Sequence, residues 1–236
     1  MKPMIVLAGG FGTRLKPILN DIPKPLAPIL NKPFIIYLLE NWIDQGVTKF
    51  IFLLHYKSKM ISETVSRYLK NHTNNIDVHF IKESKPLGTG GSIYNAINEL
   101  NIDYSFLVSN ADTWLGDGIK QISEIQPNVI LTSKVNNTDR YGSISLEKDL
   151  VRDFIEKSNS ISPGYVSSGL YHMEPSIFKK FSIGSFFSIE QDIFPTLAHE
   201  KKLKALKLET SFIDIGIPSD YNRFCEWISN DKKTKL

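Results

Sequence analysis

Short apolar runs alternate with amphipathic stretches along the first half of the chain. The apolar runs are found at residues 4–7, 50–54, 78–81 and 106–108. Short runs with few polar positions are typical of strands that are buried on both faces of a parallel sheet. We therefore predict a buried strand at each of these four places.

Between these runs, apolar residues recur at three- and four-residue spacing, as they do on one face of a helix. The first helix is predicted after Pro33 and ends at Gly46, a residue that suits a helix C-cap. Two more are predicted, one after Ser58 and one over about residues 92–100. Alternating strands and helices predict an α/β fold with a doubly wound, mostly parallel, Rossmann-like sheet and helices on both faces.

The second half of the chain is richer in strands, and a closing helix is predicted over about residues 219–228. The strands are predicted at residues 129–135, 143–146, 151–155, 165–172 and 203–208. We expect them to form a smaller, strand-rich lid over the carboxyl edge of the sheet. No repeat or long linker interrupts the sequence, so we predict a single domain over 1–226, followed by the helix end and a basic tail at 227–236.

Composition agrees with one globular domain, because 236 residues that are 42% hydrophobic can bury a sizeable core. The net charge of +3 arises from 28 basic and 25 acidic residues. That balance argues against a nucleic-acid-binding surface but is compatible with a local pocket for anions. The basic run at residues 232–235 is expected to be a solvated, frayed terminus.

The single cysteine, Cys225, cannot form an internal disulfide, which favours a cytoplasmic protein. No apolar stretch approaches the ~20 residues that a membrane span requires. The chain runs directly into its first apolar segment without the pattern of a signal peptide. We therefore expect a protein that neither spans a membrane nor is exported.

A glycine-rich turn, LAGGFGTRL, begins at Leu7 at the end of the first predicted strand. Glycines let backbone N–H groups approach a polyphosphate closely, and Arg14 adds a planar bidentate charge. A dinucleotide-binding turn would have a third glycine where Leu15 stands, and a P-loop would have Gly-Lys-Ser/Thr. The spacing therefore argues against a dinucleotide-dependent dehydrogenase and a P-loop enzyme.

A second segment, PKPLAP, begins at Pro23 and holds one lysine between two prolines. The prolines restrict the backbone, so we expect a rigid, extended segment from which Lys24 projects as a positioned cation. The alternative is a solvated lysine in a surface loop.

Together these two segments resemble the N-terminal signature of the sugar nucleotidylyltransferases. The resemblance implies the nucleotide-diphospho-sugar transferase fold and transfer of a nucleoside monophosphate from a nucleoside triphosphate to a sugar 1-phosphate, with release of pyrophosphate. It assigns catalytic roles to Arg14, at the outgoing phosphates, and Lys24, at the phosphate under attack. Loss of Lys24 is then expected to slow turnover with little change in stability. The residues assigned to the nucleotide by this turn are Leu7, Ala8, Gly9, Gly10, Gly12 and Thr13.

The resemblance places the nucleobase at PLGTGG, which begins at Pro86, and includes Gly88 and Thr89. Glu83 is similar in placement to a polar residue that reads the base edge. A carboxylate there can accept hydrogen bonds from guanine N1–H and N2–H₂, which favours GTP. The alternatives are a plain loop with a helix N-cap and a solvated acid.

Two aspartates resemble the family's magnesium ligands. Asp112 follows the strand at 106–108 in SNADT, and Asp214 lies in FIDIGIPSDY. The resemblance implies that both bind Mg²⁺, the only cofactor expected; the alternative for Asp112 is a turn cap. Ala111 replaces the family's usual glycine, and its methyl group narrows the space beside the substrate.

Further matches imply a sugar-phosphate site, which makes residues 1–113 the nucleotide-binding half and 114–226 the sugar-phosphate-binding half. RYG and FIEK supply Gly142, Glu156 and Lys157. Ser168 stands where the family often has an asparagine, and we expect it to take over the sugar contact. The five histidines show no ligand spacing.

Among subgroups, the chain is most similar to the D-glycero-D-manno-heptose-1-phosphate guanylyltransferases, which act in bacterial surface-polysaccharide pathways, including lipopolysaccharide and capsule. The expected partners are therefore a nucleoside triphosphate and a sugar 1-phosphate. The alternatives are another base (UTP or CTP), another sugar (mannose or N-acetylhexosamine 1-phosphate), and a non-catalytic module that senses sugar nucleotides. Family members are frequently oligomeric, so a homo-oligomer stays open.

Overall fold

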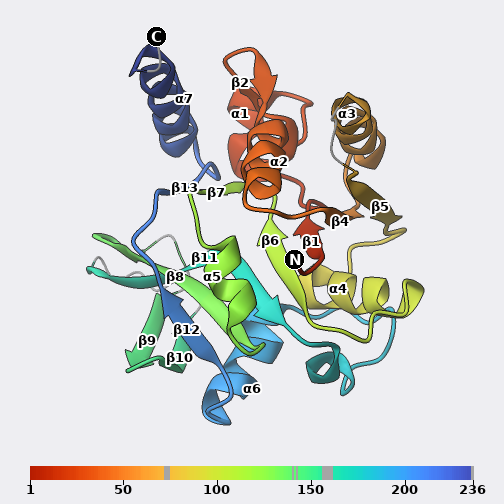
Figure 1. Ribbon diagram of the computed structural model, residues 1–236, viewed down its shortest axis with the longest axis vertical. Coiled ribbons are helices and arrows are strands. Elements are labelled where there is room, and N and C mark those ends of the chain that lie inside the picture. The colour runs from red at the N-terminus through yellow and green to blue at the C-terminus, as the bar shows by residue number, and fades with distance from the viewer. Residues whose placement is uncertain (72–74, 140, 142, 156–161, 235–236) are drawn as a thin grey trace.

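The computed structural model describes residues 1–71, 75–139, 141, 143–155 and 162–234, and Figure 1 shows how their helices and strands are arranged. Within these ranges, a sheet of nine strands forms the centre of the molecule, in the order β5-β4-β1-β6-β11-β8-β12-β10-β9. Its strands are β1 (Met4–Leu7), β4 (Lys49–Leu54), β5 (Asp77–Lys82), β6 (Phe106–Asn110), β8 (Val129–Val135), β9 (Ser143–Glu147), β10 (Leu150–Ile155), β11 (Gly164–Met173) and β12 (Lys204–Lys207).

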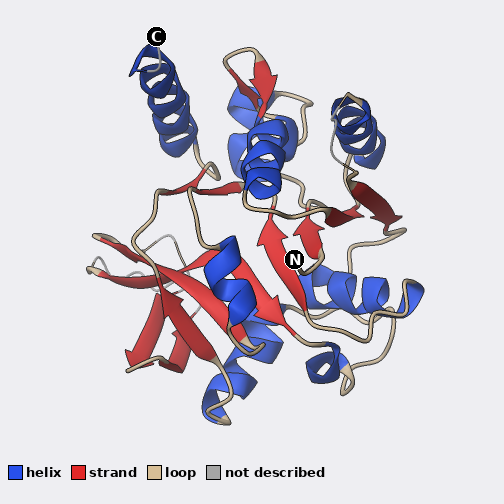
Figure 2. Ribbon diagram, in the orientation of Figure 1, coloured by secondary structure: helices blue, strands red, loops and turns tan. Residues whose placement is uncertain are grey.

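Helices cover both faces of this sheet (Figure 2). They are α1 (Lys16–Leu19), α2 (Phe34–Asp44), α3 (Ser58–Lys70), α4 (Gly88–Glu99), α5 (Ile119–Glu124), α6 (Phe194–His199) and α7 (Pro218–Thr234). The basic run expected to be a frayed terminus is in part helical, because α7 continues to Thr234.

Alternate residues of each central strand face different hydrophobic cores. On β1, Met4 and Val6 pack with α2, α3 and α7, whereas Ile5 packs with α4 and α6. Successive side chains of a strand point to opposite faces, so a strand that is apolar at every position needs a covering layer on both sides. The expected α/β fold is confirmed.

The first four strands along the sheet are parallel, and their carboxyl ends are level. Leu7 is paired with Leu53 on β4 and with Asn110 on β6. The chain runs outward from β1 through β4 to β5 and then returns to β6 on the other side of β1. Ligands of α/β proteins bind at the carboxyl edge beside such a reversal, so this topology locates the site.

From the sequence we expected the second half to form a strand-rich lid, but its strands continue the central sheet. β11 pairs antiparallel with β6 and β8, and β8, β12, β10 and β9 extend the same sheet. A strand beside the open edge of β6 satisfies backbone groups that a lid would leave unpaired. β5 also differs from the prediction of burial on both faces, because it is the edge strand and its Val78 and Phe80 are half-buried.

Two small sheets were missed because their strands are too short to show a pattern. One pairs β2 (Pro28–Ile29) with β3 (Lys32–Pro33). The other pairs β7 (Thr113–Leu115) with β13 (Phe212–Asp214), with Thr113 opposite Asp214. This second pairing brings together two segments that lie far apart in the sequence. Within the described ranges, no helix has both the length and the apolar character that a membrane span needs.

The buried His172 on β11 predicts a loss of stability in acid. Its side chain is 1% exposed, and among the described residues neither ring nitrogen has a hydrogen-bond partner of good geometry. Burial and then the charge of Lys2 lower the pKa of His172 from 6.5. The unfolded chain therefore takes up a proton near pH 6.5 that the folded chain does not, and folding stability falls as the pH drops from 6.5 to the folded pKa.

We expect His172→Leu to remove this acid-dependent part of the free energy of unfolding, measured by urea titration between pH 5 and 8 (about the range in which a histidine titrates). His199→Gln, at the exposed end of α6, is the control. An unchanged pH dependence in His172→Leu would show that other groups cause the acid sensitivity.

Candidate functional site

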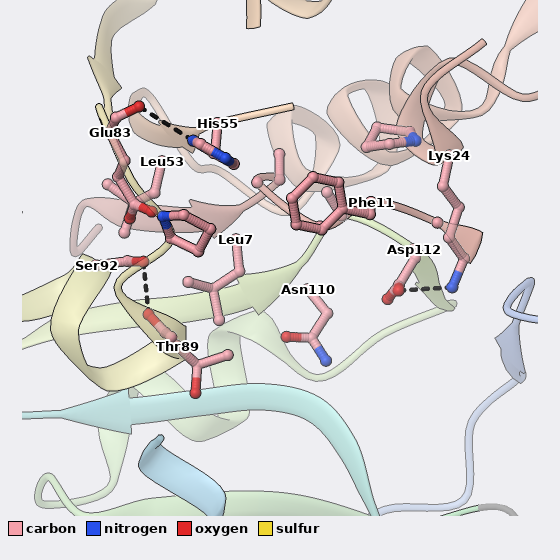
Figure 3. Close-up of a pocket in the computed structure, with 18 of the residues that line it drawn as sticks. Leu7, Phe11, Lys24, Leu53, His55, Glu83, Thr89, Ser92, Asn110 and Asp112 are labelled. Atoms are coloured by element: carbon pink, nitrogen blue, oxygen red, sulfur yellow. Dashed lines mark hydrogen bonds and ion pairs between the residues drawn. The ribbon is translucent and has the colours of Figure 1, made fainter. Parts of the chain in front are cut away.

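A cavity of about 430 Å³ opens at the carboxyl ends of β1, β4 and β6 (Figure 3). Glu83 and His55 lie at one end of it, Lys24 and Asp112 at the other, and Phe11 between them. The residues that line it are Leu7, Ala8, Gly9, Gly10, Phe11, Gly12, Thr13, Arg14, Lys24, Pro25, Leu53, His55, Glu83, Pro86, Leu87, Gly88, Thr89, Ser92, Asn110, Ala111, Asp112, Phe186, Glu190 and Gly216. The expected nucleotide-binding residues, Arg14, Lys24 and Asp112 are therefore brought to one cavity.

The glycine turn crosses the floor of this cavity. Gly12 has a φ of 61°, and a Cβ there would lie 3.1 Å from Cβ of Lys24. A Cβ on Gly10 would meet nothing within 4 Å, so its backbone faces open space. Arg14 is exposed on the 3₁₀ helix Thr13–Leu15 that follows. The turn thus combines an accessible backbone with an exposed cation, as a polyphosphate site requires.

Lys24 lies in the 3₁₀ helix Lys24–Leu26 rather than in the extended segment that its prolines suggested. The turn forms because the N–H of Leu26 donates to the carbonyl of Pro23 at 2.8 Å. Only 9% of the Lys24 side chain is exposed. Its Nζ donates to Oδ2 of Asp112 at 2.6 Å and to Oδ1 of Asp214 at 3.4 Å. A solvated surface lysine is therefore excluded.

The three charged groups set one another's pKa values. Burial acts to lower the pKa of Lys24, but the charges of Asp112 and Asp214 outweigh it and raise that pKa. Burial acts to raise the pKa of Asp112, but Lys24 holds it below the usual range. Burial and the charge of Asp112 together raise the pKa of Asp214. Asp112 and Asp214 thus share one cation, and Asp214 is the easier of the two to protonate.

The short β7–β13 pairing holds the two aspartates in place. The N–H of Ile215 donates to the carbonyl of Asp112 at 3.0 Å, and the N–H of Gly216 donates to Oδ1 of Asp214 at 2.7 Å. Among the residues that the structure describes, no cluster of three His, Cys, Asp or Glu side chains could hold a metal ion. A cation at this pair would need further oxygen ligands, such as phosphates or water.

At the other end, Glu83 is buried at 8% exposure and immobilised. Its Oε2 accepts the N–H of Leu87 at 3.3 Å, and its carbonyl lies 3.1 Å from Nδ1 of His55. Gly88 begins α4 with a φ of 72°, and a Cβ there would lie 2.5 Å from the carbonyl oxygen of Phe187. The α4 helix begins at Gly88, four residues before the predicted start at about residue 92. Gly88 lines the cavity, so the helix begins at the cavity wall.

Some expected site residues lie elsewhere. Ser168 is fully buried, its hydroxyl is 2.8 Å from that of Ser133, and it does not line the cavity, so it is not placed to contact a sugar there. Gly142, Glu156 and Lys157 lie outside the described residues. Asp214 reaches the site through Lys24.

The sequence reasoning missed several residues that line the cavity. They are Phe11, His55, Asn110, Phe186 and Glu190. His55 and Asn110 stand where parallel strands end, and this position could have identified them. Phe186 and Glu190 come from a distant segment, and no pattern in the sequence connects them to the site.

Comparison with known proteins agrees with this geometry. A family model described as nucleotidyl transferase matches residues 3–229. The chain is 36% identical to D-glycero-alpha-D-manno-heptose 1-phosphate guanylyltransferase from Campylobacter jejuni, over 93% of the chain and 97% of that protein. It is 30% identical to mannose-1-phosphate guanyltransferase from Schizosaccharomyces pombe, over 98% of the chain and 66% of that protein.

Among solved structures, HddC from Yersinia pseudotuberculosis matches with a TM-score of 0.83 and 36% identity, over 97% of this chain and 100% of that chain. A complex of HddC with GMP-PN matches with a TM-score of 0.81. The chain belongs to the nucleotidyl transferase family. The family expected from the glycine turn and PKPL is thereby confirmed.

Proposed function

We propose that this protein transfers GMP from GTP to a sugar 1-phosphate, with D-glycero-α-D-manno-heptose 1-phosphate as the favoured acceptor, and releases pyrophosphate. One observation carries the proposal: a single cavity has a buried carboxylate, Glu83, at one end and Lys24 and Asp112 at the other, with Asp214 in contact with Lys24. A nucleotide that spans it would meet an acceptor for its base at Glu83 and the cations Lys24 and Arg14 for its phosphates.

The base preference rests on Glu83. Its Oε2 accepts one N–H from Leu87, and Oε1 accepts no hydrogen bond within the described residues. A carboxylate has about four lone-pair positions, so acceptor capacity remains for guanine N1–H and N2–H₂. Uracil has one N–H between two carbonyls, so an unpaired carboxylate oxygen would face a carbonyl, which penalises UTP.

The proposed reaction is an in-line attack by a sugar phosphate oxygen on the α-phosphorus of the nucleotide, with pyrophosphate leaving on the opposite side. No covalent enzyme intermediate is needed, because positioning and charge neutralisation supply the catalysis. Lys24 would stabilise the oxygens of the phosphate under attack, and Arg14 would hold the pyrophosphate. Mg²⁺ bound at Asp112 and Asp214 would neutralise further phosphate charge.

The acceptor sugar is supported by similarity, since the Campylobacter relative is named for the heptose phosphate. The Schizosaccharomyces relative is named for mannose 1-phosphate, which stays the main alternative. Gly142, Glu156 and Lys157 remain the proposed contacts to the sugar and its phosphate. The non-catalytic alternative is disfavoured because the sequence keeps every charged station, namely Arg14, Lys24, Asp112, Lys157 and Asp214.

Pyrophosphate release over a grid of substrates tests this function. The grid crosses four nucleoside triphosphates with the 1-phosphates of heptose, mannose, glucose and N-acetylglucosamine. We expect the highest kcat/KM for GTP with the heptose. Highest kcat/KM with UTP or CTP would refute the argument from Glu83, and no release with any pair would favour the non-catalytic alternative.

A variant then ties the base preference to its residue. Glu83→Gln should lower kcat/KM for GTP by roughly 10- to 100-fold, because a charged acceptor of two hydrogen bonds is lost. Its effect on UTP should be smaller. Glu63→Gln, on the surface of α3, is the matched control. Equal losses for GTP and UTP would point to a structural role for Glu83.

A further inference from the structure

A second carboxylate reaches the cavity from a part of the chain to which no site role has been assigned. Glu190 lies in the short π-helical segment η4 (Ile189–Ile193), and it lines the cavity together with Thr89 and Phe186. It is half-buried. The residue therefore lies on the wall of the cavity beside the start of α4.

Two hydroxyl groups hold this carboxylate in one orientation. Oε2 of Glu190 accepts from Oγ1 of Thr89 at 2.6 Å and from Oγ of Ser188 at 2.7 Å. Both donors converge on the same oxygen, and Oε1 receives no hydrogen bond from any described residue. These charge-assisted bonds fix the carboxylate by Oε2 and leave Oε1 available as an acceptor.

The segment that carries Glu190 is itself tied to the start of α4. The N–H of Ile189 donates to Oγ1 of Thr89 at 3.0 Å. The carbonyl of Phe187 accepts the N–H groups of Gly90 and Gly91 at 3.0 and 3.2 Å. The hydroxyl of Thr89 thus accepts a hydrogen bond from Ile189 and donates one to Glu190. A group held this way loses little freedom when a ligand binds.

The chemistry of the position selects the kind of ligand group. A carboxylate is an acceptor only, so it needs donors, and it repels phosphates. The phosphates have their cations at Arg14 and Lys24, and the base has its own acceptor at Glu83. The remaining donors are hydroxyl groups, on the ribose of the nucleotide and on the ring of the sugar 1-phosphate, and the KM values of the two substrates distinguish them.

We propose that Glu190 is a specificity residue for the sugar, which accepts hydrogen bonds from ring hydroxyls of the sugar 1-phosphate, and that Thr89 positions it. This inference rests on the proposed function. It gives Thr89 a role beside the sugar, in addition to the expected contact with the nucleotide.

Steady-state kinetics of Glu190→Gln test the proposal, with both substrates varied. The KM for the sugar 1-phosphate should rise roughly 10- to 100-fold, the usual effect of losing a charged hydrogen-bond acceptor, while the KM for GTP stays within about twofold. Thr89→Val should raise the sugar KM by a smaller factor, because it removes one of the two donors that orient Glu190. A rise in the KM for GTP alone would overturn the proposal.

Asp192→Asn provides the matched control. Asp192 lies in the same segment, is exposed, and accepts the N–H of Ser188 at 2.7 Å, but it does not line the cavity. This variant should keep the normal sugar KM. An equal rise in Asp192→Asn would show that the segment's structure, and not the carboxylate at the cavity, determines sugar binding.

Acceptors that each lack one ring hydroxyl identify the contact. The unsubstituted enzyme should lose kcat/KM with the deoxy acceptor whose hydroxyl meets Glu190, and Glu190→Gln should be insensitive to that same change. Equal losses in both enzymes for every acceptor would overturn the inference. If the unsubstituted enzyme releases no pyrophosphate at all, the proposed function fails instead, so the two failures are distinguishable.

Discussion

Lys24→Met is expected to lower kcat by about 10²- to 10³-fold, the scale of losing one preorganised donor to a transition state. Methionine keeps the aliphatic stem beside Gly12 but removes the ammonium group that contacts Asp112 and Asp214. The same change should destabilise the protein, contrary to the expectation from the sequence. Two buried or half-buried carboxylates would lose their shared cation.

The stability effect of Lys24→Met should be about 1–3 kcal/mol. This loss of stability is smaller than the loss expected from breaking a fully buried ion pair, because the Asp112 side chain is 36% exposed. Melting temperatures with and without Mg²⁺ measure it, and Mg²⁺ should reduce the deficit by supplying another cation. Lys32→Met, which removes a half-buried ion pair to Glu40, is the control. Normal turnover in Lys24→Met would remove Lys24 from the mechanism.

Asp112→Asn and Asp214→Asn should each lower kcat by about 100-fold or more at physiological Mg²⁺, since each removes half of the proposed carboxylate pair. Each should also shift the activation curve to higher Mg²⁺. Asp112→Asn should weaken the ion pairing of Lys24 more than Asp214→Asn does, because Asp112 makes the shorter contact to Lys24.

A titration of activity against Mg²⁺, and a melting curve in Mg²⁺ without substrates, separate the two roles of these aspartates. Mg²⁺ should raise the melting temperature of the unsubstituted protein, and each Asn variant should weaken that shift. Asp77→Asn, whose side chain lies at the surface near Lys49, is the control. Full activity in excess chelator would contradict the metal assignment.

The parts of the site that the sequence anticipated are continuous in the chain. LAGGFGTRL and PKPL each carry their residues on one short segment, and the strand that ends at Leu7 defines where the turn lies. The run at Pro86 was likewise assigned to the nucleotide, and it lines the cavity beside Glu83. Local patterns of this kind are readable because the chemistry and the backbone conformation are specified by neighbouring residues.

The parts that the sequence did not anticipate depend on contacts between distant segments. The 3₁₀ turn at Lys24 buries an ammonium group that the prolines suggested would project. Ser168 lies against Ser133 inside the sheet, because β11 continues the sheet and does not belong to a lid. Glu190 reaches the cavity because its segment is hydrogen-bonded to the start of α4, through the carbonyl of Phe187 and the hydroxyl of Thr89.

Taken alone, the amino-acid sequence determined the α/β alternation, the family, and the residues of the glycine turn and the lysine segment. These features are specified locally, by the spacing of apolar residues along the chain and by the positions of glycines. The tertiary structure decided that Lys24 is the shared cation of Asp112 and Asp214, and that Glu190 faces the cavity. Both follow from the pairing of β7 with β13 and the packing of residues 186–190 on α4, which join segments about 100 residues apart. Contacts at that separation leave no periodic pattern in a single sequence.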